Sequence, residues 1–270
     1  MKILVTHINP HLDDILAIWL FKKFHPEFKE ASLDFISAHE GNIGLENTTD
    51  KVFFGVGRGK FDEHKGDIGE SAGSLVWRDL KEKKLGPKDE IELKSLDELV
   101  EWNTLIDTGR IEIGKYDEFS VPAFLRPLDN TKESSRKAVE LGCEILDRVL
   151  KVLKRKQRSI KDWGKKVEFQ SRFGKSYAIV SENISRDFCR RQDGDFYLMY
   201  NPKYKSVQYF TPKEGIDLEP LYKKLKEADQ EASWFLHHSH HFILCGAGSD
   251  PIFKHTKLSF EELIDMAKSV

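Results

Sequence analysis

The sequence lacks the features that mark secreted and membrane-spanning proteins. Only three of its 270 residues are cysteines, and Cys143, Cys189 and Cys245 lie far apart. An odd, scattered set of thiols is typical of a reducing cytosol and does not indicate a disulfide framework. No apolar run approaches the roughly 18 residues that span a bilayer, and the first residues lack the pattern of a signal peptide. We therefore expect a cytoplasmic protein without a membrane partner.

The sequence also lacks an excess of charge of one sign. Its 43 Lys and Arg and 45 Asp and Glu residues leave a formal net charge of −2 at pH 7. The electrostatics of the whole chain therefore do not by themselves indicate a nucleic-acid binder. The hydrophobic fraction of 39% is ample for a packed core. A chain of this length can form one large domain or two unequal ones.

The first half of the chain alternates between predicted strands and predicted helices. Strands are expected over residues 2–6, 33–37 and 52–56, and helices over residues 12–24, 71–80, 95–107 and 131–156. This alternation predicts an α/β domain with a mostly parallel sheet flanked by helices. In such a sheet, ligands bind at the carboxyl ends of the strands.

The pattern of predicted elements changes after a basic run at residues 151–166, where we place a domain boundary. Residues 1–157 would form the α/β domain, and residues 158–270 a smaller α+β domain that binds substrate. The basic run either lines a phosphate groove or is the solvated face of a helix. Strands are expected over residues 167–170, 177–181, 196–201 and 206–210, and helices over residues 218–227 and 259–268.

The most informative segment is V-T-H-I-N-P-H-L-D-D, which follows the first predicted strand. It places His7, His11, Asp13 and Asp14 within eight residues. Imidazole and carboxylate groups in a turn after a buried strand are typical ligands of a divalent ion. Asp13 or Asp14 could instead only cap the following helix, because carboxylates are favoured at a helix N-terminus. That alternative leaves the two histidines unexplained, and we assign Asp14 to capping or to an indirect role.

A second cluster, Asp62-Glu63-His64, follows the third predicted strand and a glycine-rich turn. Asp107 ends a predicted helix, where the dipole disfavours an acid and a cation or a basic side chain should compensate it. Together these donors suit one or two ions, Mn²⁺ best and Mg²⁺ or Fe²⁺ next. Two ions about 3.5–4 Å apart could clamp a phosphoryl group and activate the attacking water. The predicted metal ligands are His7, His11, Asp13, Asp62, His64 and Asp107.

These motifs resemble those of the DHH phosphoesterase superfamily. The pattern H-x-x-x-H-x-D at 7–13 is similar to its first motif, H-x-x-x-D-x-D, and Asp62-Glu63-His64 is similar to its D-H-H triplet. The melanocyte-proliferating-gene exonuclease branch is the nearest: its T-H and H-x-D-[DE] resemble 6–7 and 11–14. Its D-V-G, F-D-H-H-Q and S-A-G segments resemble 55–57, 61–65 and 71–77, and its C-terminal pattern resembles 235–267.

The resemblance implies a metal-dependent phosphodiester hydrolase with Asp13, Glu63 and His64 as catalytic residues. The substrate would be an RNA or DNA end or a short oligonucleotide. The chain departs from the family pattern at Gly55, where the family has its second-motif aspartate, and at Glu63, which replaces a histidine and is a candidate bridging carboxylate. A hydrolase of small phosphate esters or pyrophosphate, and a catalytically impaired nucleotide- or RNA-binding relative, are the alternatives. The oligomeric state stays open, with a homodimer among the options.

The C-terminal region contains the tract W-F-L-H-H-S-H-H-F-I-L-C-G-A-G at residues 234–248. Imidazoles and backbone N–H groups at a glycine turn suit a substrate phosphate, but the histidines could equally be incidental at a strand entrance. Arginine side chains at residues 186–191 could face a phosphodiester or form salt bridges with Asp187 or Asp193. The predicted substrate-binding residues are His240, His241, Gly246, Gly248 and Arg190.

Overall fold

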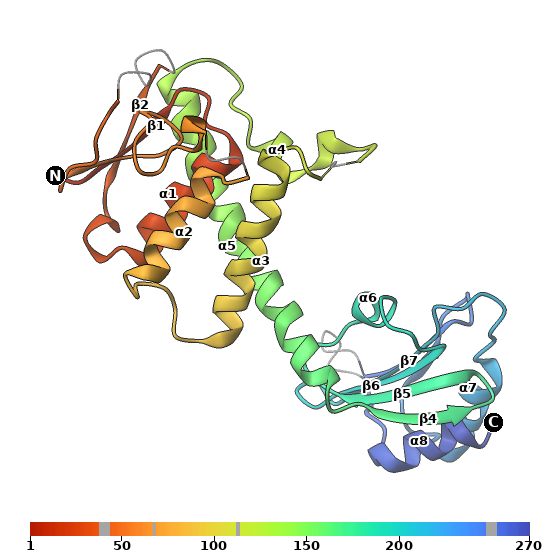
Figure 1. Cartoon of the computed structure of the whole chain (residues 1–270). Coiled ribbons are helices and arrows are strands. Elements are labelled where there is room, and N and C mark those ends of the chain that lie inside the picture. Colours follow the sequence, from red (N-terminus) through yellow and green to blue (C-terminus); the bar gives the residue numbers. More distant parts are fainter. Residues whose placement is uncertain (38–43, 67–68, 112–113, 247–252) are drawn as a thin grey trace. The chain divides into compact units, whose positions relative to one another are not determined.

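The computed structural model describes residues 1–37, 44–66, 69–111, 114–246 and 253–270 (Figure 1). The chain divides into two compact units, Met1–Lys154 and Arg155–Val270. The division falls inside helix α5, Lys132–Trp163. The sequence analysis ended this helix at residue 156. The helix continues because most of the basic run consists of good helix formers with no glycine or proline before residue 164.

The first unit is an α/β domain, as predicted. Its sheet has the order β2-β1-β3, and both neighbours run parallel to the central strand β1. The strand β3 is shorter than residues 52–56, because the backbone turns at Gly55 with a φ of 58°. The three strands are β1 (Ile3–His7), β2 (Ser32–Ile36) and β3 (Lys51–Phe53).

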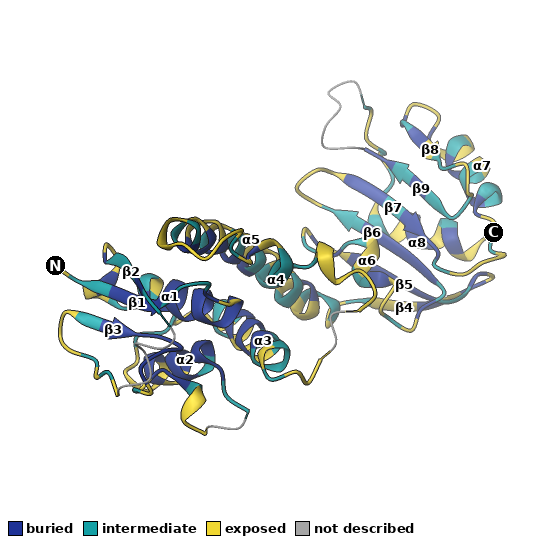
Figure 2. Ribbon diagram, turned by 90° about the horizontal axis from the view of Figure 1, so that it is seen from above, coloured by how far each residue is buried: buried dark blue, intermediate teal, exposed yellow. Residues whose placement is uncertain are grey.

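Helix α1 (Leu12–Phe24) is apolar on nearly every face and is buried along most of its length (Figure 2). Helix α2 (Ala72–Glu82) packs closely on it, since a Cβ at Gly73 would lie only 2.9 Å from Leu16 Cδ2. The other helical elements of this unit are η1 (Pro26–Phe28), η3 (Glu63–Lys65), α3 (Glu90–Asp107), η4 (Asp117–Phe119) and α4 (Val121–Phe124). The core that these elements share fixes the start of α1 against the end of β1.

Helix α3 begins at Glu90, five residues before the predicted start at residue 95. Its cap is Asp89, whose carboxylate accepts a hydrogen bond from Glu92 N at 3.2 Å. Ser95, where the sequence analysis began this helix, is buried inside it, and its hydroxyl donates to Ile91 O at 2.7 Å. Serine can satisfy its hydroxyl on the preceding turn in this way, so it does not have to end a helix.

The second unit is built on a six-stranded mixed sheet with the order β4-β5-β6-β7-β9-β8. Only β5 and β6 run parallel, and the other neighbours are antiparallel. No helix among the described residues of either unit is long and apolar enough to cross a bilayer. The elements are β4 (Val167–Ser171), β5 (Gly174–Val180), α6 (Arg186–Cys189), β6 (Phe196–Asn201), β7 (Ser206–Phe210), α7 (Glu219–Ala228), β8 (Trp234–Leu236), β9 (Phe242–Cys245) and α8 (Phe260–Lys268).

Candidate metal centre

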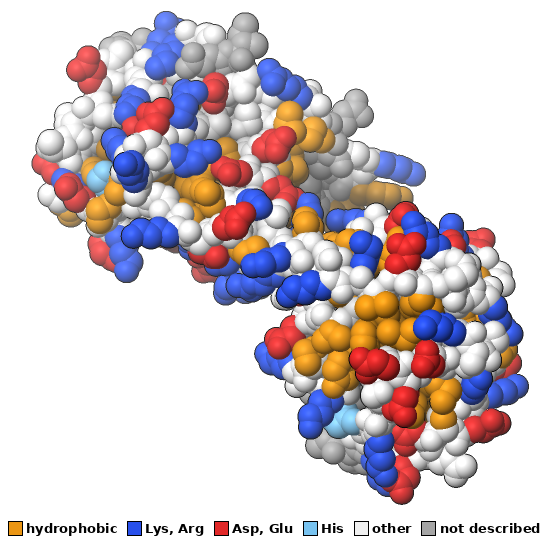
Figure 3. Space-filling view, turned by 60° about the horizontal axis from the view of Figure 1, so that its bottom comes forward, with side chains coloured by type: hydrophobic (Ala, Val, Ile, Leu, Met, Phe, Trp, Pro, Cys, Tyr) orange, Lys and Arg blue, Asp and Glu red, His pale blue; other side chains and the backbone are white. Residues whose placement is uncertain are grey.

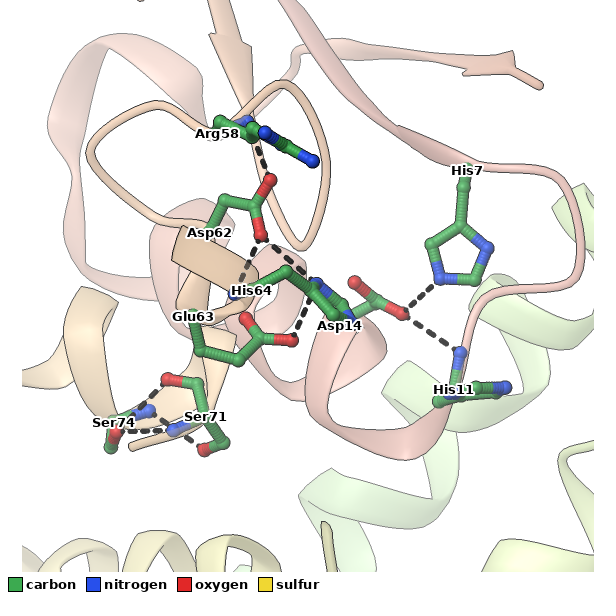
Figure 4. A network of polar contacts seen from close by, with 9 residues as sticks. All are labelled: His7, His11, Asp14, Arg58, Asp62, Glu63, His64, Ser71 and Ser74. Carbon is green, nitrogen blue, oxygen red and sulfur yellow. Dashed lines mark hydrogen bonds and ion pairs between the residues drawn. The ribbon is translucent and has the colours of Figure 1, made fainter. Parts of the chain in front are cut away.

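Two loops leave neighbouring strands at the same edge of the parallel sheet. Strand β1 ends at His7, and β3 ends at Phe53 beside it. The loop after β1 passes through His11 into helix α1, and the loop after β3 turns through Gly55 toward η3. Because both loops start at the carboxyl ends of adjacent parallel strands, their polar side chains converge on one region (Figure 4).

The first donor set consists of His7, His11 and Asp14, whose ligand atoms lie within 4.8 Å of one another. His7 Nδ1 lies 2.8 Å from Ile8 O, and Nε2 lies 2.9 Å from Asp14 Oδ2. Burial lowers the pKa of His7, but the hydrogen bond and the charge of Asp14 outweigh it and raise the pKa to about 9. A proton on His7 therefore neutralises Asp14 at neutral pH. With Nδ1 donating to the Ile8 carbonyl, Nε2 could instead bind a metal ion.

The second donor set consists of three acids, Asp13, Glu63 and Asp107, again with ligand atoms within 4.8 Å of one another. Asp13 is only 3% exposed. Burial, followed by the charges of Asp14 and Asp107, raises the pKa of Asp13 well above its ordinary value. Burial, followed by the charge of Asp14, also raises the pKa of Asp107. Carboxylates packed this closely resist ionising together unless a cation neutralises them.

The third donor set is Asp62, Glu63 and His64 on the loop after β3. Asp62 Oδ2 accepts from Arg58 N at 2.5 Å, and its Oδ1 accepts from His64 N at 3.0 Å. Oδ1 also lies 3.0 Å from His64 Nδ1. Both oxygens of Asp62 therefore shape the loop, whereas the side chain of His64 is 68% exposed and accessible to a substrate.

Glu63 belongs to the second and third donor sets and so joins them. Burial is the largest cause that raises its pKa, to about 7, and the charge of Asp14 adds to the shift. Its Oε2 atom and the Oδ1 atom of Asp14 are buried, and neither has a hydrogen-bond partner among the described residues. Leaving a buried carboxylate oxygen without a partner costs about 1–3 kcal/mol or more.

The donor chemistry fits a divalent metal ion. Within the described residues the three sets contain only carboxylate oxygens and imidazole nitrogens, with no thiolate. Such a mixture suits Mn²⁺, Mg²⁺ or Fe²⁺ better than it suits a structural zinc ion. The two unpartnered oxygens, Asp14 Oδ1 and Glu63 Oε2, are those that a cation would satisfy.

The structure brings the predicted metal ligands into this region, and their role as ligands stays a prediction. Asp14, which the sequence analysis assigned to capping, does accept a hydrogen bond from His11 N at 2.9 Å. It also belongs to the first donor set, a role that sequence reasoning missed. The one feature of the sequence that could have indicated this second function is that Asp14 directly follows another acid, Asp13. The predicted ligands gathered here are His7, His11, Asp13, Asp62, His64 and Asp107.

A cavity of about 300 Å³ lies beside the second donor set. His11, Asp13 and Asp107 line it together with the exposed side chain of Arg126. A guanidinium so close to several carboxylates can provide the charge that holds an anionic group near a metal ion. Arg126 was not identified from the sequence, because nothing in its local pattern marks it as functional.

The predicted substrate-binding residues of the second unit make contacts with neighbouring protein groups, and their role in binding a substrate stays a prediction. His240 Nδ1 lies 2.9 Å from Asp217 Oδ1, and the N–H of His241 donates to Ser239 Oγ at 3.4 Å. Gly246 lines a cavity of about 450 Å³ in which Arg155, Arg186 and several hydroxyl groups also take part. The predicted residues Arg190, His240 and His241 do not line this cavity, and Gly248 lies outside the described residues.

Arg190 makes the ordinary contacts that the sequence analysis gave as its alternative. Its Nη1 lies 2.7 Å from Asp187 Oδ1. Its guanidinium also stacks over the ring of Phe210, 5.2 Å from the centroid. The helix that carries these residues, α6, is only Arg186–Cys189, so Arg190 caps it and Arg191 lies beyond it.

No protein-family model matches the sequence, and no curated protein matches it. Solved structures do resemble it. One is the DHH domain of a protein described as a member of a family of ribosomal proteins, at 13% identity and a TM-score of 0.30, covering 99% of this chain and 86% of that one. Another is RecJ from Thermus thermophilus in complex with Mg²⁺, at 11% identity and a TM-score of 0.33. The match covers 99% of this chain and 49% of RecJ, so the chain spans about half the length of that protein.

Proposed function

We propose that this chain is a DHH-type phosphoesterase that hydrolyses phosphodiesters with the help of Mn²⁺ or Mg²⁺. The observation that carries the proposal is the convergence of the loop after β1 and the loop after β3 on neighbouring sets of carboxylates and imidazoles, of which Asp13, Asp14 and Asp62 are buried. Those two loops also contain the motifs that resemble the superfamily. One or two divalent ions held there would supply positive charge for the phosphoryl oxygens and lower the pKa of an attacking water.

The protein's own groups have distinct roles in this proposal. Asp13 and Asp107, on helices α1 and α3, would hold a metal ion, and Glu63 would contribute a carboxylate shared between donor sets. His64 is the most exposed of the titratable groups from the D-E-H triplet. Burial lowers the pKa of His64, and the neighbouring charge of Glu63 with the hydrogen bond to Asp62 raises it overall. The exposed imidazole of His64 is the group of this triplet that could donate a proton to a leaving oxygen if another residue holds the metal ion.

The size of the adjacent cavity favours a small or terminal substrate. At about 300 Å³ it is at the lower limit of typical ligand pockets. Lys and Arg side chains and Asp and Glu side chains are both present on the face of each unit that Figure 3 shows. The small cavity favours the end of an RNA or DNA strand, or a short oligonucleotide, over a long duplex.

The test is hydrolysis of an end-labelled RNA oligonucleotide by metal-stripped protein, with and without Mn²⁺. We expect a Mn²⁺-dependent ladder that starts at one end and is lost in Asp13→Ala. The control is Asp265→Ala, which removes an exposed acid of the second unit that pairs with Lys268. Cleavage that is unaffected by Asp13→Ala would refute the site.

A cavity of about 300 Å³ is also compatible with one alternative function, the hydrolysis of small phosphate esters or pyrophosphate. Assays with a dinucleotide, a nucleoside monophosphate ester and pyrophosphate separate this activity from that of an exonuclease. Mn²⁺ binding without turnover of any of these substrates would instead indicate a catalytically impaired nucleotide- or RNA-binding protein.

A further inference from the structure

Gly55 occupies a position where no side chain fits. It follows β3, has a φ of 58°, and donates its N–H to Phe61 O at 2.9 Å. A Cβ built at residue 55 would lie 1.8 Å from Asp14 Oδ1 and 3.0 Å from Asp14 Cγ. The carboxylate of Asp14 therefore fills the space into which a side chain at residue 55 would project.

The two oxygens of Asp14 have different surroundings. Oδ2 accepts from His11 N at 2.9 Å and lies 2.9 Å from His7 Nε2. Oδ1 has no hydrogen-bond partner among the described residues, although Asp14 is only 1% exposed. If the sole role of Asp14 were to cap helix α1, Oδ2 would suffice, and burying Oδ1 without a donor would only cost stability.

The resemblance to the DHH superfamily places an aspartate at residue 55, where this chain has glycine. The acid missing there is present 41 residues earlier, on the first turn of α1, in the same volume. Asp14 also lies close enough to Asp13 and Asp107 for its charge to act on both of them. It is therefore near the second donor set as well as being a member of the first.

We propose that Asp14 is a direct metal ligand through Oδ1, that it takes the place of the acid expected at residue 55, and that glycine is required at residue 55 to admit it. The inference rests on the proposed metal centre but not on the identity of the substrate. On this proposal the site keeps a buried acid in that volume without an acid at residue 55. The carboxylate then comes from the helix after β1 and not from the loop after β3.

The test measures Mn²⁺ binding by isothermal titration calorimetry and by the electron paramagnetic resonance signal of free Mn²⁺, without any substrate. The variants are Asp14→Asn, Gly55→Asp and the exchange Asp14→Gly with Gly55→Asp. Asp14→Asn keeps an oxygen that can accept from His11 N, so the cap can survive. We expect it to lose one bound ion or at least 100-fold in affinity, because a direct ligand matters more than the supporting groups whose loss costs 10–100-fold.

The exchange variant distinguishes a role of Asp14 as a metal ligand from a role as a helix cap. Aspartate tolerates a positive φ better than most residues, and removing the Asp14 side chain vacates the space that a side chain at residue 55 needs. We expect the exchange to regain Mn²⁺ binding that Asp14→Asn loses, and Gly55→Asp alone to lose it, with circular dichroism verifying that each variant is folded. Asp187→Asn is the matched control and should bind as the unaltered protein does.

Each outcome decides one question. If the unaltered protein binds Mn²⁺ and Asp14→Asn binds it equally well, Asp14 is only a cap and the inference fails while the metal centre stands. If the unaltered protein binds no Mn²⁺, the metal centre itself fails. If Asp14→Asn does not fold, the exchange variant still decides: a folded exchange protein that binds no Mn²⁺ overturns the inference.

Discussion

His7 and Asp14 form an ion pair that joins the end of β1 to the first turn of α1, with 2.9 Å between Nε2 and Oδ2. The side chain of Asp14 is 2% exposed and that of His7 16%. Truncating one member of such a pair leaves the other charge without a partner in a poorly solvated place. The pair therefore links the protonation of the site to the stability of the fold.

The stability of the metal-free protein should fall as the pH rises from about 5 to about 9. The pKa of His7 is raised from 6.5 to about 9 in the folded state. Its contribution is therefore fully present below pH 6.5 and is lost as the pH rises through 9. The pKa of Glu63 is raised from 4.5 to about 7 in the folded state. Ionisation of Glu63 therefore also lowers the stability as the pH rises, between about 4.5 and 7. Urea unfolding in a chelator, measured across this pH range, checks the prediction.

The variant His7→Gln identifies the source of that pH dependence. It should flatten the curve between pH 6.5 and 9 and leave the lower range unchanged, because Glu63 is retained. A free energy of unfolding that stays constant or rises between pH 6.5 and 9 in the unaltered protein would contradict the assignment.

Asp13→Asn should make the metal-free protein more stable while removing its response to metal. Burial, followed by the charges of the neighbouring acids, raises the pKa of Asp13. A neutral amide removes that repulsion, and we expect a gain of about 1–2 kcal/mol at pH 8. Thermal unfolding in chelator and in excess Mn²⁺ measures both effects, with Asp187→Asn as the control. A melting temperature in chelator below that of the unaltered protein would show that Asp13 is structural.

The parallel sheet and the segment from His7 to Asp14 could be predicted because their signals are local. A short apolar run followed by polar ligands and an apolar helix identifies a strand, a turn and a helix without knowledge of the rest of the chain. The D-E-H triplet at 62–64 could be assigned to the same site because loops after neighbouring parallel strands meet at one edge.

The remaining features depend on contacts between distant segments. The role proposed for Asp14 depends on the close approach of its carboxylate to the backbone of Gly55, 41 residues away in the sequence. The start of α3 was misplaced because Ser95 is typical of a cap but bonds the preceding turn instead. Asp187 and Asp217 pair with Arg190 and His240, two of the predicted substrate residues, and a sequence pattern alone does not reveal such pairings.

Arg126→Gln should impair substrate binding without impairing metal binding. Arg126 lines the cavity of about 300 Å³ that His11, Asp13 and Asp107 also line. A guanidinium there would contact a phosphate oxygen, and a charged hydrogen bond of this kind contributes about 1.5–3 kcal/mol. We expect KM for an oligonucleotide to rise about tenfold or more, with Mn²⁺ affinity unchanged by calorimetry. An unchanged KM would place the substrate elsewhere.

The three thiols should react slowly in the native protein. Burial raises the pKa of Cys189 to about 12 and the pKa values of Cys143 and Cys245 to about 11. Only about one part in a thousand of a thiol with a pKa of 11 is thiolate at pH 8, and the thiolate is the reactive form. Titration with an aromatic disulfide reagent should find three reactive thiols in denaturant. A rapid reaction of Cys189 in the native protein would contradict its burial.

Helix α5 approaches α1 closely at Gly142, where a Cβ would lie 2.5 Å from Ile15 Cγ2. Alanine is a better helix former than glycine by about 1 kcal/mol, so propensity alone predicts that Gly142→Ala stabilises the protein. Ile15 is fully buried and β-branched, so its methyl group has little freedom to move aside. Overpacking a core costs about 1–3 kcal/mol. We therefore expect Gly142→Ala to lower the free energy of unfolding despite the gain in propensity.

The double variant Ile15→Ala with Gly142→Ala tests whether this contact is the reason. Ile15→Ala alone should cost about 2–5 kcal/mol because it leaves a cavity in the core. In that background the new methyl group at residue 142 enters the space that Ile15 Cγ2 occupied. Gly142→Ala should then be neutral or stabilising, since the helix propensity remains and the overlap is gone. The sign of its effect should therefore reverse between the two backgrounds, and the same loss of stability in both would mean that another contact restricts residue 142.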